Sequence, residues 1–185
     1  MMRDHFDEDS FDWTALRDGV LLQRFKKGNN EALREILRRY EEPLIGFLTG
    51  YLCDSNLAQD VAQETFLRLI KRPPRRLNPD SLKPWLFRVA KNQAIDAIRK
   101  RKRMSPLESQ PEPATIQKTE MARSDAEYLM SQLPENLRAV VTLRIYAELT
   151  FEEIAKQLSI PLGTALWRMR RSLELMREEL ERNES

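Results

Sequence analysis

The chain has 185 residues, which is enough for one medium domain or two small ones. Charged residues make up 32% and hydrophobic residues 41%, and only five glycines are present, so a helical globular protein is favoured over a turn-rich β architecture. The acidic start, the single Cys53 and the lack of an apolar run of roughly 20 residues argue against a signal peptide, a disulfide framework and membrane insertion. We therefore expect a cytoplasmic protein.

Charge is distributed unevenly along the chain. Residues 1–18 carry a net charge of −4, whereas residues 71–103 hold twelve basic and two acidic residues, a net charge of +10. A basic block of this kind predicts binding to a polyanion, and its alternative is an ordinary solvated helix face. The acidic residues 1–18 are expected to form an arm that either discourages DNA binding or only aids solubility.

The first predicted helices form one module over residues 19–103. An apolar stripe runs at helical spacing from Leu33 to Tyr51, and Pro43 is expected to kink or split that helix. The next helix begins near the N-cap Asp54 and ends before Pro73. Its inward residues are predicted to be Leu57, Val61, Ile70 and either Phe66 or Leu67.

A third helix is predicted from about Leu82 to Arg103, with Ser81 as its cap. Its apolar face holds Leu82, Trp85, Leu86, Val89 and Ala90. A second face carries Arg88, Asn92, Arg99 and Arg103. The arginines can pair with phosphates, and the asparagine amide can both donate a hydrogen bond to a base edge and accept one from it. The preceding basic loop, residues 75–81, has the polar groups needed to hold an unstacked base.

Residues 104–123 are rich in proline and polar residues and predict a flexible linker. Helices resume over 124–185, where Ser124 with Glu127 and Thr150 with Glu153 form capping-box patterns. A helix opened by Pro134 is predicted to bury Leu137, Val140, Val141, Leu143 and Ile145. The last part of the chain then matches a helix-turn-helix, with a short helix holding Ile154, Ala155 and Leu158, a turn at Pro161 and a helix over 162–182. The predicted fold class is all-α, with two small helical domains joined by this linker.

Several motifs, in order, resemble one family. The run from Trp85 to Asn92, followed by Asp96, Arg99 and Arg103, resembles the promoter-melting helix of sigma factors, and more narrowly of the extracytoplasmic-function (ECF) group. Residues 60–66 resemble the helix that holds the RNA polymerase clamp, and residues 133–138 and 149–155 resemble the fourth sigma domain. The start of the recognition helix is matched at 161–164, and the resemblance covers about residues 19–182.

This resemblance implies the sigma region 2 bundle, the region 4 helix-turn-helix, and a set of functional residues. The implied contacts with core polymerase are Asp60, Gln63, Glu64 and Phe66. The implied contacts with the minus-ten element, which is partly melted when bound, are Arg76, Leu77, Asn78, Asp80, Ser81, Arg88, Lys91, Asn92, Arg99 and Arg103. Those with the duplex minus-thirty-five element are Thr164, Arg168 and Arg171. The family also implies an anti-sigma partner.

The chain departs from the family pattern at Leu166 and Trp167, where a basic residue and a serine are usual. Trp167 is expected to pack on thymine methyl groups, to contact a protein partner, or to fill a gap against the preceding helix. Our hypothesis is that the two residues change the preferred upstream sequence. Cys53 is expected to be a small buried hydrophobe, and His5 lacks the partners of a metal site.

Two other classes of protein remain as alternatives. A one-component helix-turn-helix regulator would bind an operator as duplex DNA, and a helical adaptor or RNA-binding protein is the third reading. Catalysis has no candidate, since the sequence lacks a glycine-rich phosphate loop, a metal-ligand cluster and a histidine outside the arm. We therefore expect neither an enzyme nor a cofactor.

Overall fold

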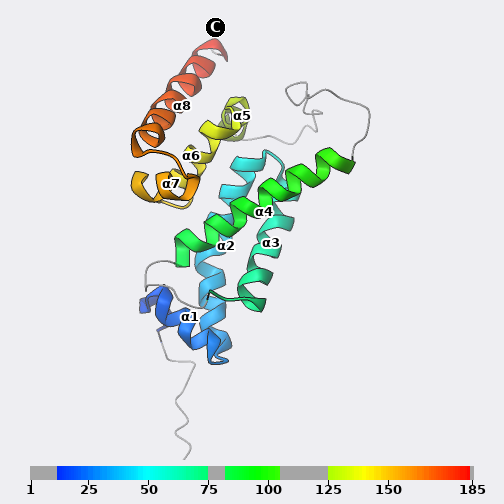
Figure 1. The fold of residues 1–185 in the computed structure, drawn as a ribbon, viewed down its shortest axis with the longest axis vertical. Helices are drawn as coiled ribbons and strands as arrows, with labels where there is room; N and C mark the ends of the chain where they lie inside the picture. Colours follow the sequence, from blue (N-terminus) through cyan, green and yellow to red (C-terminus); the bar gives the residue numbers. More distant parts are fainter. Residues whose placement is uncertain (1–11, 75–81, 105–124, 184–185) are drawn as a thin grey trace, which may run out of the picture.

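The computed structural model describes residues 12–74, 82–104 and 125–183, with residues 1–11, 75–81, 105–124 and 184–185 outside it. Within these ranges the chain forms helices and no strand, which confirms the all-α class (Figure 1). The linker, the Ser81 cap and the Ser124 capping box lie outside the described residues. The elements are a 3-10 helix, η2 (Trp13–Ala15), and helices α1 (Asp18–Lys26), α2 (Asn30–Leu52), α3 (Ser55–Lys71), α4 (Leu82–Met104), α5 (Asp125–Gln132), α6 (Glu135–Ile145), α7 (Phe151–Leu158) and α8 (Leu162–Asn183).

Helix α2 is the central element of the first domain. It begins after Asn29, whose side chain accepts a hydrogen bond from the Ala32 amide, and it continues through Pro43 without being split. Its apolar stripe, buried from Ile36 to Tyr51, packs against α1, α3 and α4 along its length. This packing on both sides of Pro43 offsets the one backbone hydrogen bond that a proline removes.

Helix α3 begins at the predicted cap, since the Asp54 carboxylate accepts a hydrogen bond from the Leu57 amide at 3.0 Å. Its buried face differs from the prediction: Leu69 is fully buried, whereas Ile70 is 40% exposed. The buried residues are Ala58, Val61, Ala62, Thr65 and Leu69. Val61 is buried and Leu57 and Phe66 pack against the core as predicted, so the difference is confined to the last turn of α3.

Helix α4 buries the predicted face, with Leu82, Leu86, Val89 and Ala90 inside and Trp85 half-buried. The sequence pattern missed Phe87, which is fully buried and meets the Phe47 ring edge-on at a centroid distance of 5.4 Å. This contact fixes α4 against α2.

A buried charge cluster joins the start of the domain to α2. The Glu35 side chain is 6% exposed and accepts hydrogen bonds from Arg38 and Arg39. Arg39 also donates to the Asp18 carboxylate at 2.9 Å and to the Trp13 carbonyl oxygen. The described end of the acidic arm, residues 12–18, therefore packs on α2.

The hydrogen bonds from Arg38, and then those from Arg39, hold the pKa of Glu35 at about 2 against an ordinary value of 4.5. A lowered pKa adds stability above pH 4.5 that is lost as the pH falls toward 2. We expect Glu35→Gln to lower the free energy of unfolding at pH 7 by roughly 2 kcal/mol, a value reduced for the solvent exposure of Arg38.

Urea denaturation at pH 7 and pH 3 measures this effect, and the difference between wild type and Glu35→Gln should shrink at the lower pH. The control is Glu31→Gln, which removes an exposed ion pair with Arg34 and should cost less than about 0.5 kcal/mol. An equal loss of stability at both pH values would contradict the assignment to the Glu35 charge.

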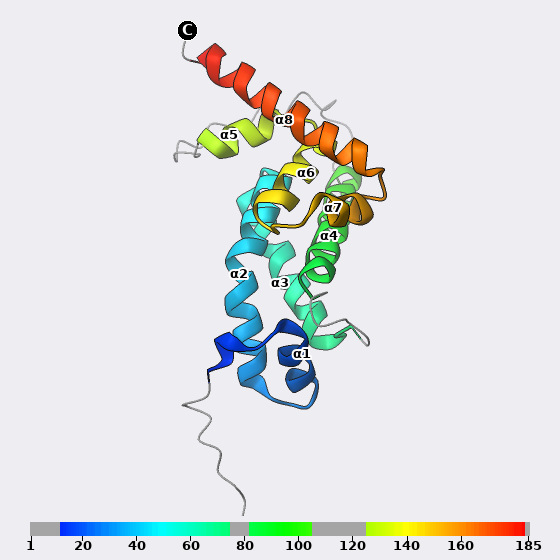
Figure 2. The same ribbon diagram turned by 90° about the vertical axis from the view of Figure 1, so that its left-hand side faces the viewer.

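The second domain consists of α5 to α8, with α6 at its centre. Leu137, Val140, Val141 and Leu143 are buried as predicted, but Ile145 is 54% exposed at the end of α6. Met130, Leu133 and Val141 form a small cluster against Met169, Leu175 and Met176 of α8. Helix α8 thereby lies across α5 and α6 (Figure 2).

The two domains pack against each other, which the sequence did not predict. Helix α6 lies on the end of α2 that is distant from α1, and one apolar core continues through both domains (Figures 1 and 2). The Tyr146 ring occupies a notch over Gly46 and Gly50. Around it, the Tyr51 hydroxyl donates to Glu135 at 2.7 Å, and Lys83 pairs with Glu148 at 2.7 Å. Burial, and then Glu135, raises the pKa of Tyr51.

Cys53 lies at this junction. It caps α2 in the left-handed conformation, with a φ of 53°, and is half-buried instead of fully buried as predicted. Its sulfur contacts the Arg138 guanidinium of α6. The αL conformation places Cys53 at the end of the helix and not in the core, which explains the difference.

Candidate polymerase and nucleic-acid interface

The outer face of α3 carries the predicted acidic group. Asp60, Gln63 and Glu64 are all exposed, and their spacing puts Asp60 and Glu64 one turn apart. Phe66, predicted as the apolar anchor of this face, is instead half-buried against the core. The exposed apolar side chains are Leu67 at 43% and Ile70 at 40%.

The structure therefore makes Leu67 and Ile70 the apolar residues next to the acidic pair, and sequence reasoning missed this role for both. The signal was present, because residues 60, 63, 67 and 70 recur at helical spacing. We call the exposed set Asp60, Gln63, Glu64, Leu67 and Ile70 the α3 face.

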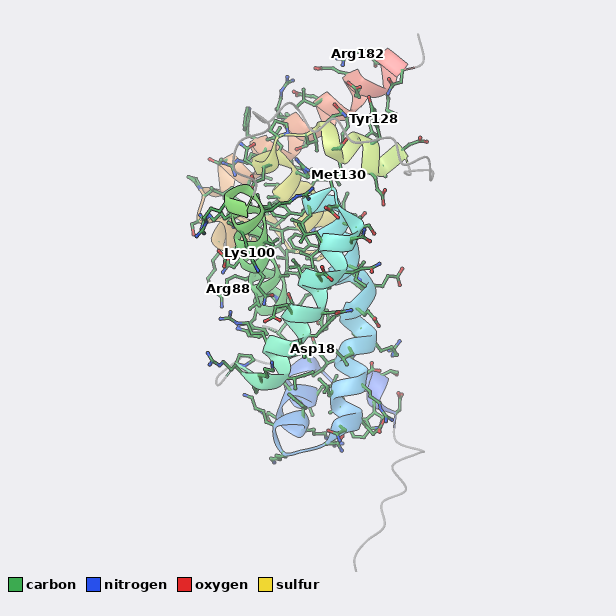
Figure 3. All side chains as sticks on the ribbon, turned by 90° about the vertical axis from the view of Figure 1, so that its right-hand side faces the viewer. Asp18, Arg88, Lys100, Tyr128, Met130 and Arg182 are labelled. Carbon is green, nitrogen blue, oxygen red and sulfur yellow. The ribbon has the colours of Figure 1, made fainter. Side chains whose placement is uncertain are left out.

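The predicted polar face of α4 is confirmed as exposed. Arg88, Asn92, Arg99 and Arg103 are all exposed along the helix, and Lys100 adds a further cation. Figure 3 shows Arg88 and Lys100 along α4, which lies at the edge of the molecule beside α3. The Asp96 carboxylate lies 3.8 Å from Arg99, and the row of cations keeps a net positive charge.

Lys91 differs from the rest of this set. It is half-buried, and burial lowers the pKa of its ammonium group while Glu135 of α6 acts in the opposite direction. The second domain therefore lies next to one of the residues predicted to meet the minus-ten element. Arg76, Leu77, Asn78, Asp80 and Ser81 lie outside the described residues.

The helix-turn-helix is built as the sequence predicts. Thr150 caps α7 in a complete capping box, with the Thr150 amide donating to Glu153 and the Glu153 amide donating to Thr150. Ser159 ends α7 in the left-handed conformation, and the Ile160 amide donates to the Ala155 carbonyl oxygen at 3.0 Å. Ala155 and Ala165 are buried, so small residues let α7 and α8 approach closely.

The start of α8 presents a mixed outward surface. Thr164, Arg168 and Arg171 are half-buried, and Arg171 pairs with Glu174 at 3.1 Å. Arg170, which was not among the predicted contacts, is exposed. Trp167 is 58% exposed and Leu166 46% exposed, so Trp167 does not fill a gap against the preceding helix.

Other kinds of site find no support in the described ranges. No group of three or more His, Cys, Asp or Glu side chains is arranged there to hold a metal ion. None of the helices described has the length and apolar character needed to cross a membrane.

Comparisons with known proteins match the two regions of the chain that carry these surfaces. The family model Sigma-70 region 2 matches residues 36–104, and the model Sigma-70, region 4 matches residues 129–178. RNA polymerase sigma factor CarQ of Myxococcus xanthus is 30% identical over 86% of this chain and 95% of its own length. ECF RNA polymerase sigma factor SigW of Bacillus subtilis is 28% identical over 86% of this chain and 94% of its own length.

Solved structures show the same fold. The sigma factor RpoE of Bartonella quintana, solved in complex with the anti-sigma factor NepR, has a TM-score of 0.66 at 22% identity and covers 80% of this chain and 96% of its own. CnrH, solved in complex with the cytosolic domain of CnrY, has a TM-score of 0.65 at 18% identity, over 89% and 97% of the two chains. With both sigma regions matched in order and relatives aligned over nearly their whole length, this chain belongs to the ECF group of RNA polymerase sigma factors.

Proposed function

We propose that this sigma factor directs promoter-specific initiation through three surfaces: the α3 face for core polymerase, α4 with the loop 75–81 for the minus-ten element, and α8 for the minus-thirty-five element. The observation that carries the proposal is the separation of charge in one bundle. An exposed acidic and apolar face on α3 adjoins an exposed row of cations on α4. A single domain can thereby hold a basic protein surface and a nucleic acid at the same time.

At the minus-ten element, Arg88, Arg99 and Arg103 are placed to pair with phosphates, and Asn92 with a base edge. The loop residues Arg76, Leu77, Asn78, Asp80 and Ser81 would hold a flipped base. Unstacking costs a few kcal/mol per base, which the pocket contacts and the phosphate pairs offset. Lys91 would join this surface once the second domain has moved away from it.

At the minus-thirty-five element, the first turns of α8 would enter the major groove. Thr164, Arg168 and Arg171 remain the proposed contacts, and the exposure of Arg170 adds it to them. A bidentate arginine–guanine pair contributes roughly 1–3 kcal/mol of discrimination.

An anti-sigma protein is the proposed regulator, because RpoE of Bartonella quintana was solved with one. Polymerase and promoter DNA both reside in the bacterial cytoplasm, where we expect the chain to act. Its action is regulatory, and catalysis belongs to the polymerase.

The test is run-off transcription with purified chain, core polymerase and a library of genomic fragments. We expect discrete transcripts from a small set of fragments sharing two upstream elements, and none without the chain. Gel-shift binding on the same fragments separates this function from a one-component regulator, which would bind duplex DNA tightly without polymerase. Tight binding by the chain alone, with no transcripts, would favour the regulator.

A further inference from the structure

The first two turns of α8 expose three large apolar side chains, Leu162, Leu166 and Trp167, in a region otherwise suited to DNA. Trp167 is 58% exposed and Leu166 46% exposed, and they are adjacent in the chain. Neighbouring exposed apolar side chains that form a contiguous patch mark a candidate interaction surface, unlike a single exposed side chain. About half of each side chain is left uncovered by the described part of the second domain.

The neighbours of this pair indicate what the partner is. Arg170 is exposed one turn further along α8, and Arg171 lies beside it. Gly163, Trp167, Arg170 and Glu174 follow at intervals of four, three and four residues, so Trp167 and Arg170 share the outward face. An apolar pair bordered by arginines matches a duplex, in which phosphates flank base edges.

Within the major groove, the 5-methyl group of thymine is the apolar group that a base edge presents. Resting on the proposed function, we propose that Trp167 and Leu166 recognise thymine methyl groups in the minus-thirty-five element. Trp167 and Arg171 are four residues apart, a rise of about 6 Å along the helix. Base pairs are spaced about 3.4 Å apart, so the recognised thymine lies within about two base pairs of an arginine contact.

The experiment uses holoenzyme reconstituted from the full chain and core polymerase. Its preferred promoter is first obtained by binding-site selection, and each thymine of the upstream element is then replaced by deoxyuridine, which lacks only the methyl group. Wild-type holoenzyme should lose about fourfold in affinity for each contacted methyl group, the effect of burying one such group. Trp167→Ser and Leu166→Ser holoenzymes should each lose part of this difference between the thymine and deoxyuridine promoters, and the double variant should bind the two promoters equally well.

The control is Leu180→Ser, which removes another exposed leucine of α8. Leu180 is 44% exposed and lies fourteen residues beyond Leu166, about 21 Å along the helix axis. This variant should retain the full sensitivity to the methyl group.

Three results would count against the inference. The first is a Trp167→Ser variant that keeps both the selected sequence and the methyl sensitivity. The second is a Trp167→Ser variant that weakens assembly of the holoenzyme and leaves the DNA preference unchanged. The second result would make Trp167 a protein contact. The third is a wild-type holoenzyme that selects no sequence at all. This result would overturn the proposed function itself, so failure of the proposed function can be told apart from failure of the inference about Trp167.

Discussion

Replacing both Asp60 and Glu64 with lysine is expected to weaken binding of the chain to core RNA polymerase by about a hundredfold, or about 3 kcal/mol. Both carboxylates are exposed on the α3 face. Reversal places like charges against a basic partner, which costs several kcal/mol. Fluorescence anisotropy of labelled chain titrated with core polymerase measures the change.

A matched control is provided by α2, where Glu41 and Glu42 are also exposed. Their double replacement by lysine changes the net charge by the same amount at another place in the domain. Circular dichroism should show both variants folded. If both double variants weaken binding to core polymerase equally, the effect reports net charge alone. If the Asp60→Lys, Glu64→Lys variant binds core polymerase as tightly as the wild type, the α3 face has no part in the proposed mechanism.

Replacing Gly46 with valine is expected to separate the two domains. A Cβ atom on Gly46 would lie 2.6 Å from two carbons of the Tyr146 ring, a distance that forces the ring out of its notch. Overpacking of this kind costs about 1–3 kcal/mol, which raises the population of separated domains by roughly 5- to 150-fold. Small-angle X-ray scattering should show a larger radius of gyration for the variant.

Two further variants make this prediction specific to the contact with Tyr146. Gly163→Ala adds a Cβ atom where nothing lies within 4 Å, and it should leave the scattering unchanged. Tyr146→Ser in the Gly46→Val background removes the clash, and part of the compaction should return. A scattering profile for Gly46→Val identical to that of the wild type would show that the notch does not hold the domains together.

Interactions between residues close together in the chain made the helix starts and the exposed cations predictable from the sequence. Asp54, Thr150 and Glu153 mark helix starts because their side chains satisfy amides that the helix leaves unpaired, and the structure shows each of these caps. The cations of α4 recur at steps that keep them on one face, and they are exposed. The helix-turn-helix follows in the same way from its capping box, its turn and its small alanines.

Side-chain burial at the edges of the apolar stripes was decided by packing. Leu69 is buried and Ile70 is 40% exposed, and Phe66 packs against the core instead of joining the α3 face. Periodicity gives the direction of a stripe only to within about one residue, since adjacent positions differ by 100° around a helix. Leu67 and Ile70 could therefore be identified as exposed only once the neighbouring helices were in place.

The all-helical class, the two modules and the charges that each presents can be predicted from the chain alone, because they depend on residues close together in it. How the helices pack sets the fit of Tyr146 over Gly46 and Gly50, the position of Glu135 near Lys91 and the exposure of Trp167. These contacts join residues up to a hundred positions apart. Their energy depends on the shape of both surfaces, which no local pattern records.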